Sequence, residues 1–205
     1  MTTGALERLV RRSSGRRDPA PERCDLCAVP LPDRHRHLLD EERGELLCGC
    51  QACVLLFERD AAGGRHYRLV PQRRLRLAGV PTDELGVPVG LAFFVRQPDG
   101  RVVAGYPSPA GATTWEVDQA AWRRLVERCP VLGDLQPGVE ALLVDTARGA
   151  DEHWLVPIDD CYRLVALVRR QWTGLSGGSA VWAEIERFFA ELGPRAARPR
   201  PGRSR

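Results

Sequence analysis

A cysteine-rich stretch at residues 24–57 sets the first limit on the fold, and it reads CDLCAVPLPDRHRHLLDEERGELLCGCQACVLLF. Cys24 and Cys27 form one C-x-x-C pair, and Cys50 and Cys53 form a second. Each pair places two thiolates on a tight turn, from which both can bind the same tetrahedral metal ion. Two such pairs at this separation are typical of a four-cysteine metal site. The sequence therefore predicts a small metal-binding module over residues 24–58.

Three further side chains of this stretch are candidate metal ligands. Cys48 lies just before the second cysteine pair, and His35 and His37 lie between the two pairs. If residues 35–39 form a strand, the two histidines share one of its faces, because side chains alternate along a strand. The four paired cysteines are the favoured ligands, and these three are candidates for the same site or its surroundings.

Two kinds of metal centre fit this ligand set. A structural zinc ion would supply folding free energy to a module that is too small to bury a core of its own. The surplus of ligands would instead suit an exchangeable metal, an iron–sulfur cluster or a redox-active thiol. Rubredoxin-like iron sites usually have a glycine after each cysteine pair, whereas Ala28 and Val54 stand there in this chain. Zinc is therefore favoured, with an iron–sulfur or thiol centre at the five cysteines as the alternative.

The distribution of charge argues against a protein that binds nucleic acid through its folded part. All 30 basic residues are arginines, and the net charge is +3. Residues 1–23 carry +3 and residues 194–205 carry +5, so residues 24–193 together carry −5. A nucleic-acid interface needs clustered positive charge on the folded body. Here the positive charge lies in the two ends of the chain.

The sequence also predicts a cytoplasmic protein. The N-terminal residues have no apolar run of signal-peptide length, and no stretch of eighteen apolar residues occurs. In a reducing compartment, clustered cysteines are typical of metal sites rather than of disulfides. The odd number of cysteines, seven, also disagrees with a framework made only of disulfides.

The rest of the chain has the pattern of an α+β body at residues 65–193. Residues 66–77 alternate in polarity and predict one exposed or edge strand. The patterns that follow predict strands at 89–95, 101–106, 139–145 and 153–157, and helices at about 117–129, 159–172 and 179–192. This order predicts an antiparallel sheet covered by helices on one face. Upstream, the order is a C-x-x-C turn (a knuckle), a hairpin, a second knuckle and a helix, which predicts a zinc-ribbon or treble-clef-like module. Residues 1–23 and 194–205 are predicted to be disordered.

Other reactive side chains have simpler interpretations. Residues 174–178 match G-x-S-x-G around Ser176, but a predicted helix precedes this serine and no histidine follows it, which excludes a nucleophile elbow. Cys129 and Cys161 lie on the apolar faces of predicted helices and are expected in the core. His153 and Asp145 lie in predicted strands, and no pattern gives them catalytic partners.

Several segments together resemble an uncharacterised protein family. They are CDLC, HRHLLD and CGCQAC in the cysteine-rich stretch, and then GYPSPAGAT, WLVPIDDCYRLVALVR and GLSGG. The chain resembles a domain-of-unknown-function family found mainly in actinobacteria, with genes that often lie beside those for uptake [NiFe]-hydrogenases. The resemblance implies an accessory role in hydrogenase assembly or electron supply, with hydrogenase subunits or maturation factors as partners. It implies no catalytic residues.

Taken together, these observations favour a non-enzymatic accessory protein that has a structural four-cysteine metal site. It is expected to contact a protein partner during maturation or assembly of a metalloenzyme such as a [NiFe]-hydrogenase. The alternative from a different functional class is a small redox or electron-transfer protein. A zinc module that binds nucleic acid is disfavoured by the acidic body.

Overall fold

The computed structural model describes residues 22–58, 66–87, 90–108, 110–172 and 178–193. The predicted disordered ends lie outside these ranges, apart from residues 22 and 23, and so does Ser176 with most of its glycine-rich string. Within the described ranges, none of the helices combines the length and the apolar character that crossing a membrane requires.

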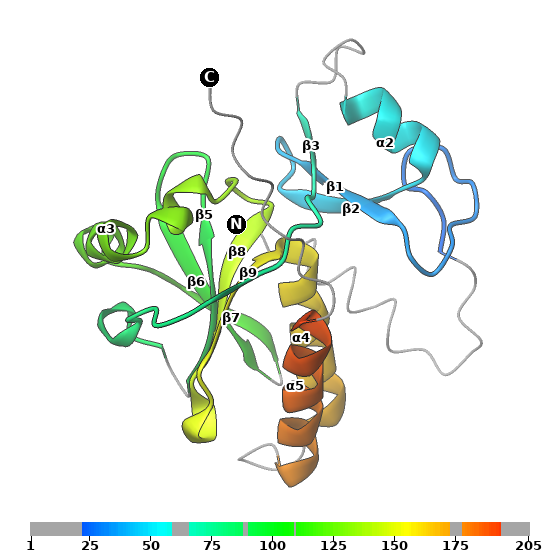
Figure 1. The fold of residues 1–205 in the computed structure, drawn as a ribbon. Coiled ribbons are helices and arrows are strands. Elements are labelled where there is room, and N and C mark those ends of the chain that lie inside the picture. Colours follow the sequence, from blue (N-terminus) through cyan, green and yellow to red (C-terminus); the bar gives the residue numbers. More distant parts are fainter. Residues whose placement is uncertain (1–21, 59–65, 88–89, 109, 173–177, 194–205) are drawn as a thin grey trace.

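The cysteine-rich stretch forms a small sheet and one helix (Figure 1). The sheet is antiparallel with the order β2-β1-β3, and its strands are β1 (Arg36–Asp40), β2 (Glu45–Gly49) and β3 (Tyr67–Leu69). Gly44 turns the chain between β1 and β2 with a φ of 63°, in the left-handed region that glycine adopts easily. α2 (Gln51–Glu58) follows β2 directly. We call residues 22–58 together with β3 the cysteine module.

The body contains a six-stranded antiparallel sheet with the order β4-β9-β8-β5-β6-β7. Its strands are β4 (Leu75–Leu77), β5 (Leu91–Arg96), β6 (Val102–Ser108), β7 (Gly111–Glu116), β8 (Glu140–Asp145) and β9 (Glu152–Pro157). The predicted α+β class is confirmed, with antiparallel sheets. The sequence did not predict β7, which begins within the segment GYPSPAGAT, because its proline and glycine content is typical of a loop.

Helices cover both faces of the larger sheet, so the prediction of a single covered face is wrong (Figure 1). α4 (Ile158–Gln171) and α5 (Gly178–Leu192) pack on one face, over residues such as Phe93 and Leu143. α3 (Gln119–Arg128) packs on the other face, against Phe94 and Leu142. The reason is visible in the central strands: β5 and β8 are apolar at nearly every position, which is the pattern of a strand buried on both sides.

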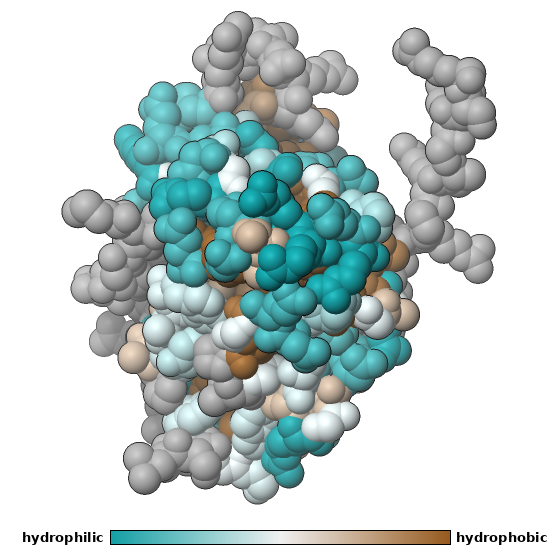
Figure 2. All heavy atoms as spheres, turned by 90° about the vertical axis from the view of Figure 1, so that its left-hand side faces the viewer, coloured by the Kyte–Doolittle hydropathy of each residue, from teal (hydrophilic) through white to brown (hydrophobic). Residues whose placement is uncertain are grey.

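The helices begin and end close to the predicted residues. Asp118 caps α3, where its side chain accepts a hydrogen bond of 2.8 Å from the Ala121 backbone N–H. The buried face of α3 carries Trp122 and Leu125, and its exposed arginines reach Glu84 at 2.6 Å (Arg124) and 3.0 Å (Arg128). Figure 2 looks onto this side of the molecule and shows a mostly hydrophilic surface.

The segment predicted as one strand at residues 66–77 is divided between the two sheets. β3 pairs with β1 of the cysteine module, whereas β4 pairs with β9 of the body. Two buried carboxylates hold the connection between them. Arg73 donates to Glu140 at 2.9 and 2.8 Å, and Arg74 donates to Asp160 at 2.5 and 3.0 Å. These ion pairs fasten the crossing chain to β8 and to α4.

Candidate metal centre

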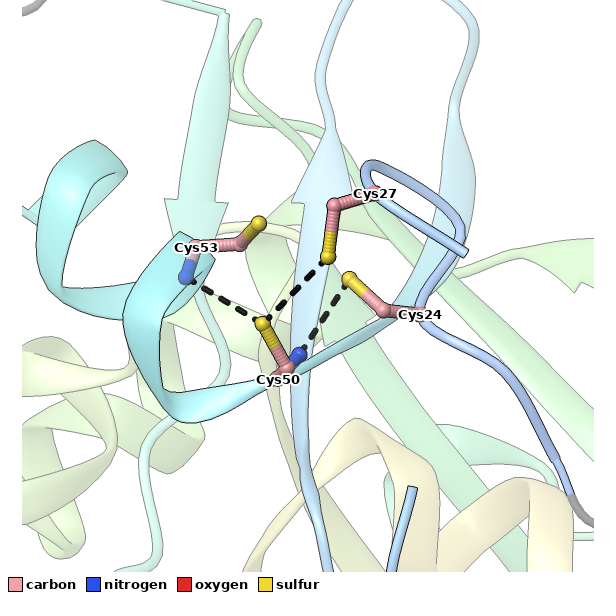
Figure 3. Close-up of side chains that lie close together, drawn as sticks. All are labelled: Cys24, Cys27, Cys50 and Cys53. Atoms are coloured by element: carbon pink, nitrogen blue, oxygen red, sulfur yellow. Dashed lines mark hydrogen bonds between the residues drawn. The ribbon is translucent and has the colours of Figure 1, made fainter. Parts of the chain in front are cut away.

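Two short turns bring the four paired cysteines together (Figure 3). Cys24 and Cys27 lie on a turn closed by a hydrogen bond of 2.8 Å from the Ala28 backbone N–H to the Cys24 carbonyl oxygen. Ala28 has a φ of 61°, so it adopts the left-handed conformation for which glycine is usual after such a pair. Cys50 and Cys53 flank the first turn of α2, which follows the β1–β2 hairpin.

The four thiol groups converge on one point. Their sulfur atoms all lie within 4.8 Å of one another, and Cys27 Sγ lies 3.6 Å from Cys50 Sγ. Four sulfurs that bind one ion at about 2.3 Å are separated by about 3.8 Å, the edge of the tetrahedron they define. Cys24 and Cys53 are buried, and Cys27 is exposed. The four side chains can therefore hold a metal ion.

Backbone N–H groups support negative charge at this cluster. The Cys50 N–H donates to Cys24 Sγ at 3.3 Å, and the Cys53 N–H donates to Cys50 Sγ at 3.4 Å. Burial works against ionisation of Cys24, but N–H groups of Cys50, Leu26 and Cys27 outweigh it and lower its thiol pKa to about 6. Burial and the neighbouring thiols raise the pKa of Cys53. One thiol of the cluster is thus ready to ionise, and metal binding would draw the protons from the others.

The remaining three predicted ligands form a separate group. One ring nitrogen each of His35 and His37 and the Cys48 sulfur lie within 4.8 Å of one another. The seven candidate ligands are thereby divided into a cluster of four cysteines and a cluster of two histidines with one cysteine. Cys48 does pack beside Cys24 and Cys53 in the same apolar cluster, so the two groups are neighbours.

The second group includes a partner that the sequence pattern did not indicate. His37 Nδ1 lies 3.1 Å from Asp159 Oδ2, in the first turn of α4. Burial alone would lower the pKa of His37, but hydrogen bonds with Asp159 and Cys48 raise it to about 10. The only available signal for Asp159 was a pair of acidic residues at a helix start. A contact across 122 positions leaves no local pattern.

The other reactive residues are placed elsewhere. Cys161 is fully buried in the core between the larger sheet and the helices α4 and α5, and burial raises its thiol pKa well above the usual range. Cys129 packs at the edge of the opposite core. His153 and Asp145 are buried in the adjacent strands β9 and β8. All seven cysteines are free thiols.

Comparison with known proteins identifies one family. Neither the curated proteins nor the solved structures include a match to this chain. Residues 23–196 match a family of unknown function, DUF5947. The match includes both cysteine pairs, the candidate ligands His35 and His37, and the whole described body. The chain therefore belongs to the DUF5947 family.

Proposed function

We propose that the protein is a cytoplasmic, non-enzymatic accessory protein whose cysteine module is held together by one zinc ion and contacts a protein partner. The process it assists is maturation or assembly of a metalloenzyme such as a [NiFe]-hydrogenase. The observation that carries the proposal is the convergence of four thiols from two knuckles within 4.8 Å. A zinc ion bound by four protein side chains has no open coordination position, which is the pattern of structural rather than catalytic sites.

The spacing of the sulfurs supports a single ion. In a four-iron cluster each cysteine binds a different iron, so the thiolates stand farther apart than around one shared ion. Here even the widest separation is at most 4.8 Å. The zinc-ribbon or treble-clef type of module is part of the same proposal, supported by the order knuckle, hairpin, knuckle and helix.

The surface of the cysteine module supports a role in protein contacts. Among the described residues, the large hydrophobic side chains that are clearly exposed are Val29, Leu55 and Leu56, with 44, 50 and 60% of their surface accessible. All three belong to this module, and two of them are consecutive residues of α2. That these exposed apolar side chains all belong to the one module makes it the candidate interaction surface. The choice of a hydrogenase as the assisted enzyme rests on the family resemblance.

Binding of the purified large-subunit precursor of a [NiFe]-hydrogenase tests the proposed partner. The wild-type chain is expected to retain the precursor, and the double variant Leu55→Ser/Leu56→Ser to lose retention while keeping its zinc. Arg187→Ser changes an exposed residue of α5 and serves as the matched control, with retention unchanged. No retention by the wild-type chain would eliminate this partner. Full retention by the double variant would place the contact away from α2.

A redox protein is the second candidate, because four thiolates around one ion also suit a single iron. The division of the ligands changes this alternative: Cys48 groups with the histidines, so the centre would involve four cysteines rather than five. The visible spectrum separates the two candidates, since thiolate-bound iron absorbs strongly and zinc does not.

A further inference from the structure

We propose that His35, His37 and Cys48 form a second metal site, distinct from the four-cysteine centre, which binds a borderline divalent transition-metal ion such as Zn²⁺. One nitrogen from each ring and the Cys48 sulfur lie within 4.8 Å of one another, a separation that one shared ion can bridge. This site goes beyond the proposed function, which needs only the four paired cysteines.

The backbone of the hairpin places the three side chains. His37 on β1 is directly opposite Cys48 on β2 in the antiparallel pair, so their side chains leave the same face of the sheet. His35 lies two residues before His37, and the two rings meet edge to face with centroids 4.8 Å apart. The arrangement follows from strand pairing, which makes it a rigid support for ligands.

The hydrogen bonds of His35 prepare one of its nitrogens to bind a metal. Its Nδ1 lies 3.0 Å from the Pro32 carbonyl oxygen, which can only accept, so Nδ1 carries the proton. In the neutral ring, Nε2 then has a free lone pair. Within the described part of the chain, this buried Nε2 has no hydrogen-bond partner, and Glu22 Oε2 lies 3.5 Å from it. A bound cation would satisfy both atoms.

His37 is oriented in the same way by a carboxylate. Its Nδ1 lies 3.1 Å from Asp159 Oδ2, so the Nδ1–H donates to Asp159. A bound metal ion would take the place of the second proton, the one on Nε2, because a histidine must be neutral to act as a ligand. A carboxylate behind a histidine is the usual support of a metal-binding imidazole, because it fixes the tautomer and strengthens the nitrogen as a donor. Here the support comes from α4, so the site joins the cysteine module to the body.

Two imidazoles and one thiolate define the class of metal. This donor set suits Zn²⁺ and ions of similar softness, and it does not suit Mg²⁺ or Ca²⁺, which prefer oxygen. Three protein ligands leave one tetrahedral position for water or another ligand. Such an open position distinguishes this site from the closed four-cysteine centre.

A proton relay is the competing interpretation of the same residues. Cys48, His37 and Asp159 follow one another as thiol, imidazole and carboxylate, which is the order of a cysteine nucleophile with its base. Two observations favour the metal. The relay gives no role to His35, whose Nε2 is the unpartnered atom, and Cys48 is only 5% exposed, which hides the sulfur from a substrate.

Titration of the metal-free full-length protein with Co²⁺ under reducing conditions tests the second site. The wild-type chain is expected to bind two equivalents. The second equivalent adds one thiolate bond where the first adds four, so it should contribute about a quarter as much charge-transfer absorption. Cys48→Ser and His35→Gln should each bind one equivalent and keep the absorption of the first. Cys129→Ser, which removes a cysteine from the opposite core, should still bind two.

Either of two results would overturn the site. One is a wild-type chain that binds a single equivalent; the other is retention of both equivalents by Cys48→Ser and by His35→Gln. Circular dichroism shows whether each variant is folded, and the histidine variant keeps the test valid if replacing the buried cysteine unfolds the module. A wild-type chain with one equivalent and rapid alkylation of Cys48 would establish the relay instead.

The variant Asp159→Asn tests whether Asp159 orients the ligand His37, while all three proposed ligands stay in place. Removal of such a carboxylate typically weakens metal affinity by about 10- to 100-fold. The expected result is a loss of this size for the second Co²⁺ equivalent with no change in the first. Equal affinity for the second equivalent in this variant would mean that Asp159 does not orient a ligand.

Discussion

His37 Nδ1 on β1 lies 3.1 Å from Asp159 Oδ2 at the start of α4, and this contact joins the cysteine module to the body. The next residue, Asp160, receives both hydrogen bonds from Arg74 on the connection that leaves the module. Two consecutive carboxylates of α4 thus hold two different parts of the chain. Both lie in the first turn of α4, where the helix dipole attracts acidic side chains.

The ion pair between Arg73 and Glu140 should be important for stability. Glu140 is fully buried and accepts hydrogen bonds from Arg73 and from the Gln136 backbone N–H at 3.0 Å. Glu140→Gln would leave the guanidinium without its counter-charge, and we expect the free energy of unfolding to fall by about 2–4 kcal/mol. Urea unfolding followed by circular dichroism measures the change.

A surface ion pair provides the control for this variant. Glu116 pairs with Arg101 at 3.3 Å, and both side chains are more than half exposed. Glu116→Gln should change stability by less than about 1 kcal/mol. Equal effects of the two substitutions would mean that burial does not set the strength of these pairs.

Asp145 should make stability decrease as the pH rises. Burial raises the pKa of its carboxyl to about 6, and nearby Glu152 and Glu186 act in the same direction. Between about pH 4 and pH 6, the folded chain holds a proton here that the unfolded chain has released, so raising the pH favours unfolding. Asp145→Asn removes this cost and still accepts the hydrogen bond from the Ala147 N–H. It should be more stable by about 1–2 kcal/mol at pH 7 and equal to wild type near pH 4.

Asp99→Asn is the matched comparison for this pH dependence. Asp99 is exposed in a turn, and its hydrogen bond with Arg101 lowers the pKa of its carboxyl. A carboxyl whose pKa is lowered in the folded state stabilises that state when it is ionised, and this stabilisation is lost as the pH falls. Any effect of Asp99 on the pH dependence of stability is therefore opposite in sign to that of Asp145. The account of Asp145 fails if thermal unfolding shows the same pH profile for wild type and Asp145→Asn.

Gly105 leaves room for the ring of Phe93, its partner on β5. A Cβ atom at Gly105 would come within 2.6 Å of Phe93 Cζ, and this ring is buried in the core under α4 and α5. Gly105→Ala should therefore destabilise the fold by about 1–3 kcal/mol, because the ring must leave its position. At Gly133 a Cβ atom would meet only ordinary contact, at 3.5 Å from Val126 Cγ1, and Gly133→Ala should be close to neutral. Similar unfolding midpoints for both variants would contradict this explanation.

The features that the sequence predicted well are those with a local pattern. The two C-x-x-C pairs predicted the four-cysteine cluster, and the spacing of apolar residues predicted α3, α4 and α5 to within two residues at each end. The alternation of His35 and His37 placed both on one face. Each of these relations involves neighbours along the chain.

The features that were missed depend on contacts between distant segments. Residues 66–77 alternate in polarity throughout, but whether they form one strand or two depends on which sheet edges they can pair with. In the structure they pair with two, β1 of the cysteine module and β9 of the body. The separation of Cys48 from the other cysteines follows from its register with His37. Asp159 and Glu140 have no sequence signature as partners of His37 and Arg73, because charged residues are common on helix and strand surfaces.

The most direct test of the central claim is the metal content of protein purified without oxygen, measured together with its visible spectrum for the wild-type chain and Cys24→Ser. Four converging thiolates around one zinc ion predict a colourless wild-type protein that contains zinc. Cys24→Ser should contain one equivalent less and show a less stable cysteine module, because metal binding contributes to its folding free energy. Iron with strong absorption near 400 nm, or equal zinc content in both proteins, would contradict the account.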